Sequence, residues 1–200
     1  MQHDRFINDL LVYYLDAVLH ELESSEKSRA IVLETYDNYR ALRPPKPTYQ
    51  QFITDNSDGS VWWESRLRLL QILGAGNNKE PSYDVAAITA RVQPFEQELV
   101  PEMIILGGRQ NMHEEALKLL THNLGDFDTA IRYCLLGGLS LFHTRGTSVS
   151  QDELPSKEEQ SRLLRLLLLE FLRIEDQSDR FERTEELLER FGSWFDASEV

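Results

Sequence analysis

Apolar residues recur every three or four positions through most of the chain, and this spacing predicts helices that bury one side. The first stripe consists of Ile7, Leu11, Tyr14, Val18 and Leu22, and Asp4 is placed to cap that helix. A second stripe, over residues 26–42, stops before Pro44-Pro45-Lys46-Pro47. The residue that precedes a proline is pushed out of helical geometry, so the pattern predicts two helices followed by a stiff connector.

Turn and capping residues divide the middle of the chain into short helices. Thr48 is placed to cap residues 49–54, Gly74 ends a helix over residues 61–73, and Ser82 is placed to cap residues 83–92. Pro101 predicts a kink or a restart in the next helix, which continues to about Gly107-Gly108.

Capping and turn residues also divide the second half of the chain into helices. We expect Asn111 to cap a helix over residues 112–124, Gly125 to end it and Asp126 to cap residues 127–136. Ser156 and Glu159 form a capping box for a helix that reaches Ile174. That helix is apolar nearly all round, which predicts that neighbours cover it on several sides. Asp179 is placed to start the last helix.

Short helices joined by loops of a few residues place sequence neighbours antiparallel. Ala116 and Ala130 stand at central helix positions, where small side chains allow close packing. The sequence therefore predicts an all-α fold, specifically an α-solenoid of stacked antiparallel helical hairpins. Ser198-Glu199 resembles the cap of a helix that has not begun, so we expect residues 1–200 to be one solenoid fragment of a longer chain.

Charge and composition narrow the classes of partner. The 200 residues include 21 Lys and Arg against 34 Asp and Glu, a formal charge of −13. Such a chain repels phosphate and has no basic stripe for nucleic acid or for anionic lipid. The longest apolar run, residues 163–172, is about half the length that crosses a bilayer. With one cysteine and no signal peptide, the sequence predicts a cytoplasmic protein without direct membrane insertion.

Residues 112–134 contain two His, two adjacent Glu and the only Cys, but not the spacing of a catalytic or metal site. The zinc-protease helix needs a second His four residues after the first, and Leu117 stands there after His113. We therefore expect His113 to lie in an exposed first turn. His122 falls on another helix face, and Cys134 fits a small buried hydrophobe. The sequence predicts no catalytic residue, metal or cofactor, and hence no enzyme.

Two sets of aromatic residues are candidate contacts with a partner protein, since aromatic side chains concentrate at interfaces. For Trp62-Trp63 we favour one buried ring beside a half-buried one over an exposed anchor. The last helix carries the predicted partner-binding set, whose apolar area exceeds what a final helix should leave bare: Phe181, Leu188, Phe191, Trp194 and Phe195. The alternative is that further helices cover these residues.

Residues 99–138 resemble the signature of the vacuolar-sorting and TGF-β receptor-associated protein family. The matching positions are His113, Glu114, Glu115, Ala116, Leu117, Leu120, Asp126, Phe127, Ala130, Tyr133 and Cys134. In this pattern the alanines permit close helix approach, the large apolar residues fill the seam and Asp126 caps a helix. The roles are those of a scaffold, so we do not expect these residues to contact a partner.

The resemblance implies a function. Members of the family are subunits of the HOPS and CORVET tethers, which hold endosomal or vacuolar membranes together before fusion, and their C-terminal solenoids bind the class C core. It implies a non-enzymatic scaffold, peripheral on endosomal or vacuolar membranes, that binds a class C core subunit. The chain shows neither the β-propeller pattern linked to Rab recognition nor a cysteine-rich zinc module, so Rab binding is not expected. The alternative is a helical-repeat adaptor in receptor-associated signalling, unrelated to tethering.

Overall fold

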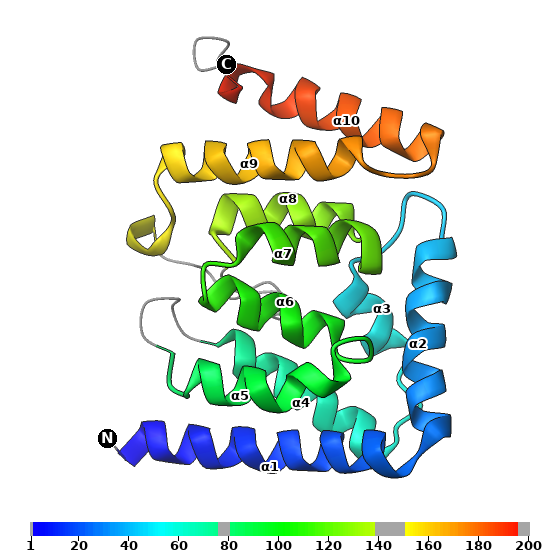
Figure 1. Ribbon diagram of the computed structural model, residues 1–200, viewed down its shortest axis with the longest axis vertical. Helices are drawn as coiled ribbons and strands as arrows, with labels where there is room; N and C mark the ends of the chain where they lie inside the picture. The colour runs from blue at the N-terminus through cyan, green and yellow to red at the C-terminus, as the bar shows by residue number, and fades with distance from the viewer. Residues whose placement is uncertain (1, 76–80, 139–150, 196–200) are drawn as a thin grey trace.

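A computed structural model describes residues 2–75, 81–138 and 151–195, with side chains from Arg5 onward (Figure 1). These residues form ten α-helices and no β-strand, which confirms the prediction of an all-α fold. The helices are α1 (Gln2–Ser24), α2 (Glu26–Ala41), α3 (Tyr49–Asp55), α4 (Val61–Gly74), α5 (Val85–Val92), α6 (Val100–Arg109), α7 (His113–Lys118), α8 (Phe127–Leu136), α9 (Lys157–Leu172) and α10 (Gln177–Phe191). None of them is long and apolar enough to span a bilayer.

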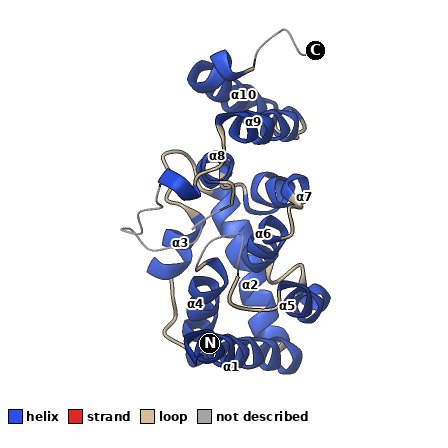
Figure 2. Cartoon of the chain, turned by 90° about the vertical axis from the view of Figure 1, so that its left-hand side faces the viewer, coloured by secondary structure: helices blue, strands red, loops and turns tan. Residues whose placement is uncertain are grey.

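The helices lie in successive layers along the long axis, with α1 at one end and α10 at the other (Figures 1 and 2). α2 is the exception, because it runs along the side of the stack and crosses α1 steeply. Only Ser25 separates α1 from α2, and one linking residue is too short for the reversal that an antiparallel pair needs. α1 packs instead mainly on α4. The finer prediction, a regular solenoid of hairpins, stays a prediction.

Most helix boundaries follow from side-chain caps. The hydroxyl of Thr48 accepts a hydrogen bond from the Gln51 amide, and Ser156 does the same for Glu159, as predicted. α5 begins later than predicted, because Asp84 caps it in place of Ser82. α10 begins earlier than predicted, because Asp176 caps it in place of Asp179. Both chosen residues are aspartates, which are at least as good N-caps as the alternatives.

The predicted helix over residues 112–124 changes register in its second half. α7 begins after Met112, not after Asn111, which has a positive φ of 58°. After Lys118 the chain continues as a π-helix, Leu119–Leu124, and Gly125 ends it with a φ of 68°. A π-turn widens the backbone and often marks a functional site. The π-helix contacts α2, α6 and α8, and its His122 pairs with Glu170 of α9.

α9 packs on α7 and α8 and also on α10, so it has neighbours on more than one side, as predicted (Figure 1). Leu163, Leu167 and Phe171 of α9 are fully buried, but Leu169 and Leu172 on its outer side are about half exposed, at 51% and 50%. The described residues therefore leave one strip of α9, at Leu169 and Leu172, open to solvent. A further neighbour would be needed to bury that strip as well.

Candidate functional site

The signature histidine is buried in the core. At the start of α7, His113 is 8% exposed, and its Nδ1 lies 2.6 Å from the hydroxyl of Tyr133 in α8. The two rings meet edge to face, with centroids 5.7 Å apart. The expectation that His113 lies in an exposed first turn is therefore wrong, although Glu114 and Glu115 beside it are exposed. His113 and Tyr133 join α7 to α8.

Two glycines of the signature hold the same tyrosine from other sides. A Cβ on Gly108, in α6, would lie 3.1 Å from the Tyr133 hydroxyl oxygen. A Cβ on Gly138, which follows α8, would lie 3.1 Å from Tyr133 Cε2, and Gly138 has a φ of +85°. At this distance a side chain on either glycine would fit only if the Tyr133 ring shifted by a few tenths of an ångström. The signature thus specifies a cluster around Tyr133, with His113 on one side and glycine backbone on the others.

Burial of His113 predicts a pH dependence of stability. Desolvation lowers the pKa of His113 below its ordinary value of 6.5, and Arg162 adds to this while Glu159 opposes it. The unfolded chain then binds more protons than the folded one below about pH 6.5, so the free energy of unfolding should fall as the pH drops through that range. Replacement of His113 by Gln should flatten this slope. Urea unfolding at pH 5, 6, 7 and 8 measures it.

The control is His20→Gln, because His20 is exposed on α1. We expect the slope of His20→Gln to match that of the unaltered chain. A slope in His113→Gln as steep as in the parent would show that His113 does not carry the effect.

The other two candidates for chemistry lie apart from His113. Nε2 of His122 is 2.8 Å from Oε2 of Glu170 in α9, and Glu170 also pairs with Arg173 at 2.8 Å. Cys134 is a free, fully buried thiol, and burial raises its pKa well above the usual value. Among the described residues no three His, Cys, Asp or Glu side chains are grouped to hold a metal.

A buried ion pair links the stack to α2, and the sequence reading did not identify it. Arg66 in α4 and Glu102 in α6 have fully buried side chains, with Nε 2.9 Å from Oε1. Nη2 of Arg66 also donates to the Tyr36 hydroxyl of α2, at 2.9 Å, and to the Glu98 carbonyl, at 3.2 Å. Arg66 stands three residues after the buried Trp63 and four before the buried Leu70, and this spacing was the available signal. In the Trp62-Trp63 pair, Trp63 is buried and Trp62 is half-buried, which is the arrangement favoured from the sequence.

The structure divides the predicted partner-binding set. Phe181 and Leu188 on α10 are exposed, at 66% and 44%. Phe191 is buried at 8% and stacks edge to face on Trp194, which is half-buried like Phe195. The exposed pair is spaced by seven residues and so shares one face of α10. We use the name apolar patch for Leu169, Leu172, Phe181 and Leu188; Leu172 and Phe181 line one shallow hollow.

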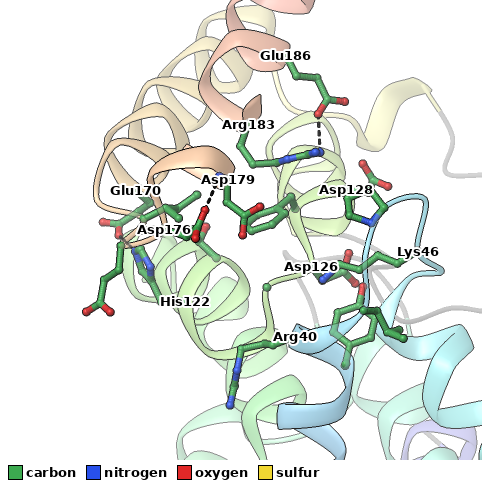
Figure 3. Close-up of a pocket in the computed structure, with 18 of the residues that line it drawn as sticks. Arg40, Lys46, His122, Asp126, Asp128, Glu170, Asp176, Asp179, Arg183 and Glu186 are labelled. Atoms are coloured by element: carbon green, nitrogen blue, oxygen red, sulfur yellow. Dashed lines mark hydrogen bonds and ion pairs between the residues drawn. The ribbon is translucent and has the colours of Figure 1, made fainter. Parts of the chain in front are cut away.

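A separate groove of about 950 Å³ lies between α2, the proline turn after it, the α7–α8 junction and the α9–α10 hairpin (Figure 3). Its carboxylates belong to Asp126, Asp128, Glu170, Glu175, Asp176, Asp179 and Glu186, and its cationic side chains to Arg40, Lys46, Lys118, Arg173 and Arg183. The sequence alone did not indicate this groove, because its walls come from three separate segments, residues 39–46, 118–128 and 170–186.

Lys46 reaches into the groove from the proline turn (Figure 3). Its ammonium lies 4.3 Å from the centre of the Tyr39 ring and 5.6 Å from that of Phe127. Burial lowers the pKa of Lys46, while the carboxylates of Asp126 and Asp179 act in the opposite direction. Asp126 itself is fixed at the start of α8, where it accepts hydrogen bonds from Thr129 and from the Tyr49 amide at 2.8 Å.

Comparison with known proteins gives one similarity of note. The chain is 29% identical to mouse "Transforming growth factor-beta receptor-associated protein 1" over 122 residues. The match covers 61% of this chain but only 14% of the mouse protein, so the chain spans a small part of that relative. No family model matches the sequence, and no solved structure gives a significant match. The chain is thus weakly similar to a receptor-associated protein, over a stretch long enough to include several of its helices.

Proposed function

We propose that this chain is a non-enzymatic scaffold segment of a subunit in a HOPS- or CORVET-type membrane-tethering complex. In this proposal it works in the cytoplasm, peripheral to endosomal or vacuolar membranes, and binds a class C core subunit through its helical surface. The similarity to the mouse protein supports the assignment. So does the structural use of the signature, since His113, Tyr133 and Asp126 serve packing and capping.

The observation that carries the proposal is the apolar patch on α9 and α10. Leu169, Leu172, Phe181 and Leu188 are all exposed by more than 40% of their surface. Neighbouring large apolar residues left open to water mark protein interaction sites. The patch also lies at one end of the stack, where a helix of another subunit can pack on α9 and α10 without disturbing the other layers (Figure 1).

Double replacement of Phe181 and Leu188 by Ala should weaken binding to the class C subunit. Anchors in an interface contribute more than about 1 kcal/mol each, so together we expect at least a roughly thirtyfold rise in Kd. The melting temperature should stay near that of the unaltered chain, because both side chains are exposed. Biolayer interferometry with the purified class C subunit, and thermal unfolding, provide the two measurements.

The matched control is Phe6→Ala with Tyr13→Ala, because both residues are large, exposed and seven apart on α1, at the other end of the stack. That variant should bind normally. Phe191→Ala serves as the folding control, since Phe191 is buried and its loss should lower stability. Normal binding by the Phe181/Leu188 variant would contradict the assignment of the patch.

The second candidate function is a helical-repeat adaptor in receptor-associated signalling, unrelated to tethering. The name of the mouse relative, which describes association with a receptor, favours it. Affinity purification from cells followed by mass spectrometry separates the two. Recovery of tether subunits supports the first proposal, and recovery of a receptor complex without them supports the second.

A further inference from the structure

The groove presents carboxylates that the protein itself does not neutralise. Of its seven carboxylates, Glu170 and Glu186 pair with Arg173 and Arg183, each at 2.8 Å. Asp128 and Asp179 make no direct ion pair within the described part of the chain and act on Lys46 only through space. The groove also has more carboxylates than cationic groups, seven against five. It therefore favours a cationic ligand over an anionic one.

The floor of the groove already receives an ammonium group. Lys46 places its Nζ over the Tyr39 ring and near Phe127, within the field of Asp126, Asp128 and Asp179. An ammonium over an aromatic face is attracted by the ring, and a carboxylate field adds to this attraction. The same combination of aromatic faces and carboxylates would attract a lysine or arginine side chain from outside.

A second, independent observation points to a ligand. Thr121, which lines the groove on the π-helix, is 3% exposed, and its Oγ1 has no hydrogen-bond partner in the described residues. A buried hydroxyl without a partner is destabilising, so nearly all such groups in native proteins are satisfied. A ligand that donates a hydrogen bond would satisfy Thr121 once the side chains that cover Oγ1 in the unbound groove shift aside.

We propose that the groove binds a cationic segment of a partner protein, whose Lys or Arg side chains compete with Lys46 for the aromatic and carboxylate floor. The volume of about 950 Å³ accommodates several side chains. The net charge of −13 attracts such a segment from a distance. This site does not overlap the apolar patch, and the inference does not depend on the tethering function.

A synthetic octalysine peptide is the probe, with octaglutamate as its counterpart, in isothermal titration at an ionic strength of about 0.15 M. Replacement of Asp128 and Asp179 by Asn should weaken octalysine binding about tenfold, since each exposed contact with a carboxylate is worth up to about 1 kcal/mol. The control is Glu185→Gln with Glu189→Gln, which removes the same charge from exposed residues outside the groove. It should change the affinity less than twofold.

Two further variants test the details. Lys46→Met removes the competing ammonium and keeps a side chain of similar length, so octalysine should bind several times more tightly. Thr121→Val should weaken binding while the melting temperature holds or rises, because an unsatisfied hydroxyl is lost. Equal losses in the two charge variants, weaker binding by Lys46→Met, or preferential binding of octaglutamate would each overturn the proposal.

Discussion

Replacing Arg66 by Met is expected to lower the free energy of unfolding by about 3–5 kcal/mol. The reason is the carboxylate of Glu102, which is fully buried and would lose its only cationic partner among the described residues. Water cannot replace the guanidinium at that depth. The Tyr36 hydroxyl and the Glu98 carbonyl would lose a donor at the same time. Urea unfolding followed by circular dichroism measures the effect.

Two variants distinguish loss of the pair from loss of side-chain volume. Arg68→Met is the matched control, because Arg68 is exposed on the same helix and its replacement should cost less than about 0.5 kcal/mol. The double variant Arg66→Met, Glu102→Met removes both charges and should recover most of the stability, as apolar replacements of buried ion pairs do elsewhere. A loss below about 1 kcal/mol in Arg66→Met alone would show that the pair is not needed.

The Arg66 pair also bears on the proposed groove, through α2. Arg66 joins α4 and α6 to Tyr36 of α2, the helix that runs along the side of the stack (Figure 1). α2 and the proline turn after it supply Tyr39, Arg40 and Lys46 to the groove. Loss of Arg66 is therefore expected to loosen one wall of the groove, while the apolar patch at the far end of the stack keeps its surface.

Local features of the fold were readable in the sequence, because they depend on residues close together in the chain. Thr48, Asp126 and Ser156 cap the helices that they were predicted to cap. Where two capping residues lie two or three positions apart, as with Ser82 and Asp84, the pattern alone could not choose between them. The π-turn after α7 was not predictable either, because a shift of one hydrogen-bond register leaves the apolar spacing nearly unchanged.

Contacts between distant residues needed the tertiary structure. The spacing in α10 showed which residues share a face but not which face another helix covers. Phe181 and Phe191 therefore looked alike in sequence, although one is 66% exposed and the other 8%. Likewise, the partner of His113 is twenty residues away in α8. The groove depends on three separate segments, and no pattern in any one of them indicates the others.

Replacing Gly138 by Ala is expected to lower the free energy of unfolding by about 2–3 kcal/mol, which tests the cluster around Tyr133. Two costs combine. Gly138 has a φ of +85°, where an L-residue loses roughly 1–2 kcal/mol. The new Cβ would also lie 3.1 Å from Tyr133 Cε2, and overpacking of a fixed ring adds roughly 1 kcal/mol or more. Chemical unfolding of the variant gives the total.

Two other glycines separate these costs. Gly59 has a φ of +71° but nothing within 4 Å of the added Cβ, so Gly59→Ala should show the backbone cost alone, about 1–2 kcal/mol. Gly192 has a φ of −55° and open space, so Gly192→Ala should be neutral or stabilising by up to about 1 kcal/mol. If Gly138→Ala costs no more than Gly59→Ala, the ring of Tyr133 moves easily and the signature glycine serves the turn alone. If Gly138→Ala costs more than Gly59→Ala, the ring of Tyr133 is fixed in place. Gly138, Tyr133 and His113 then form one packing unit.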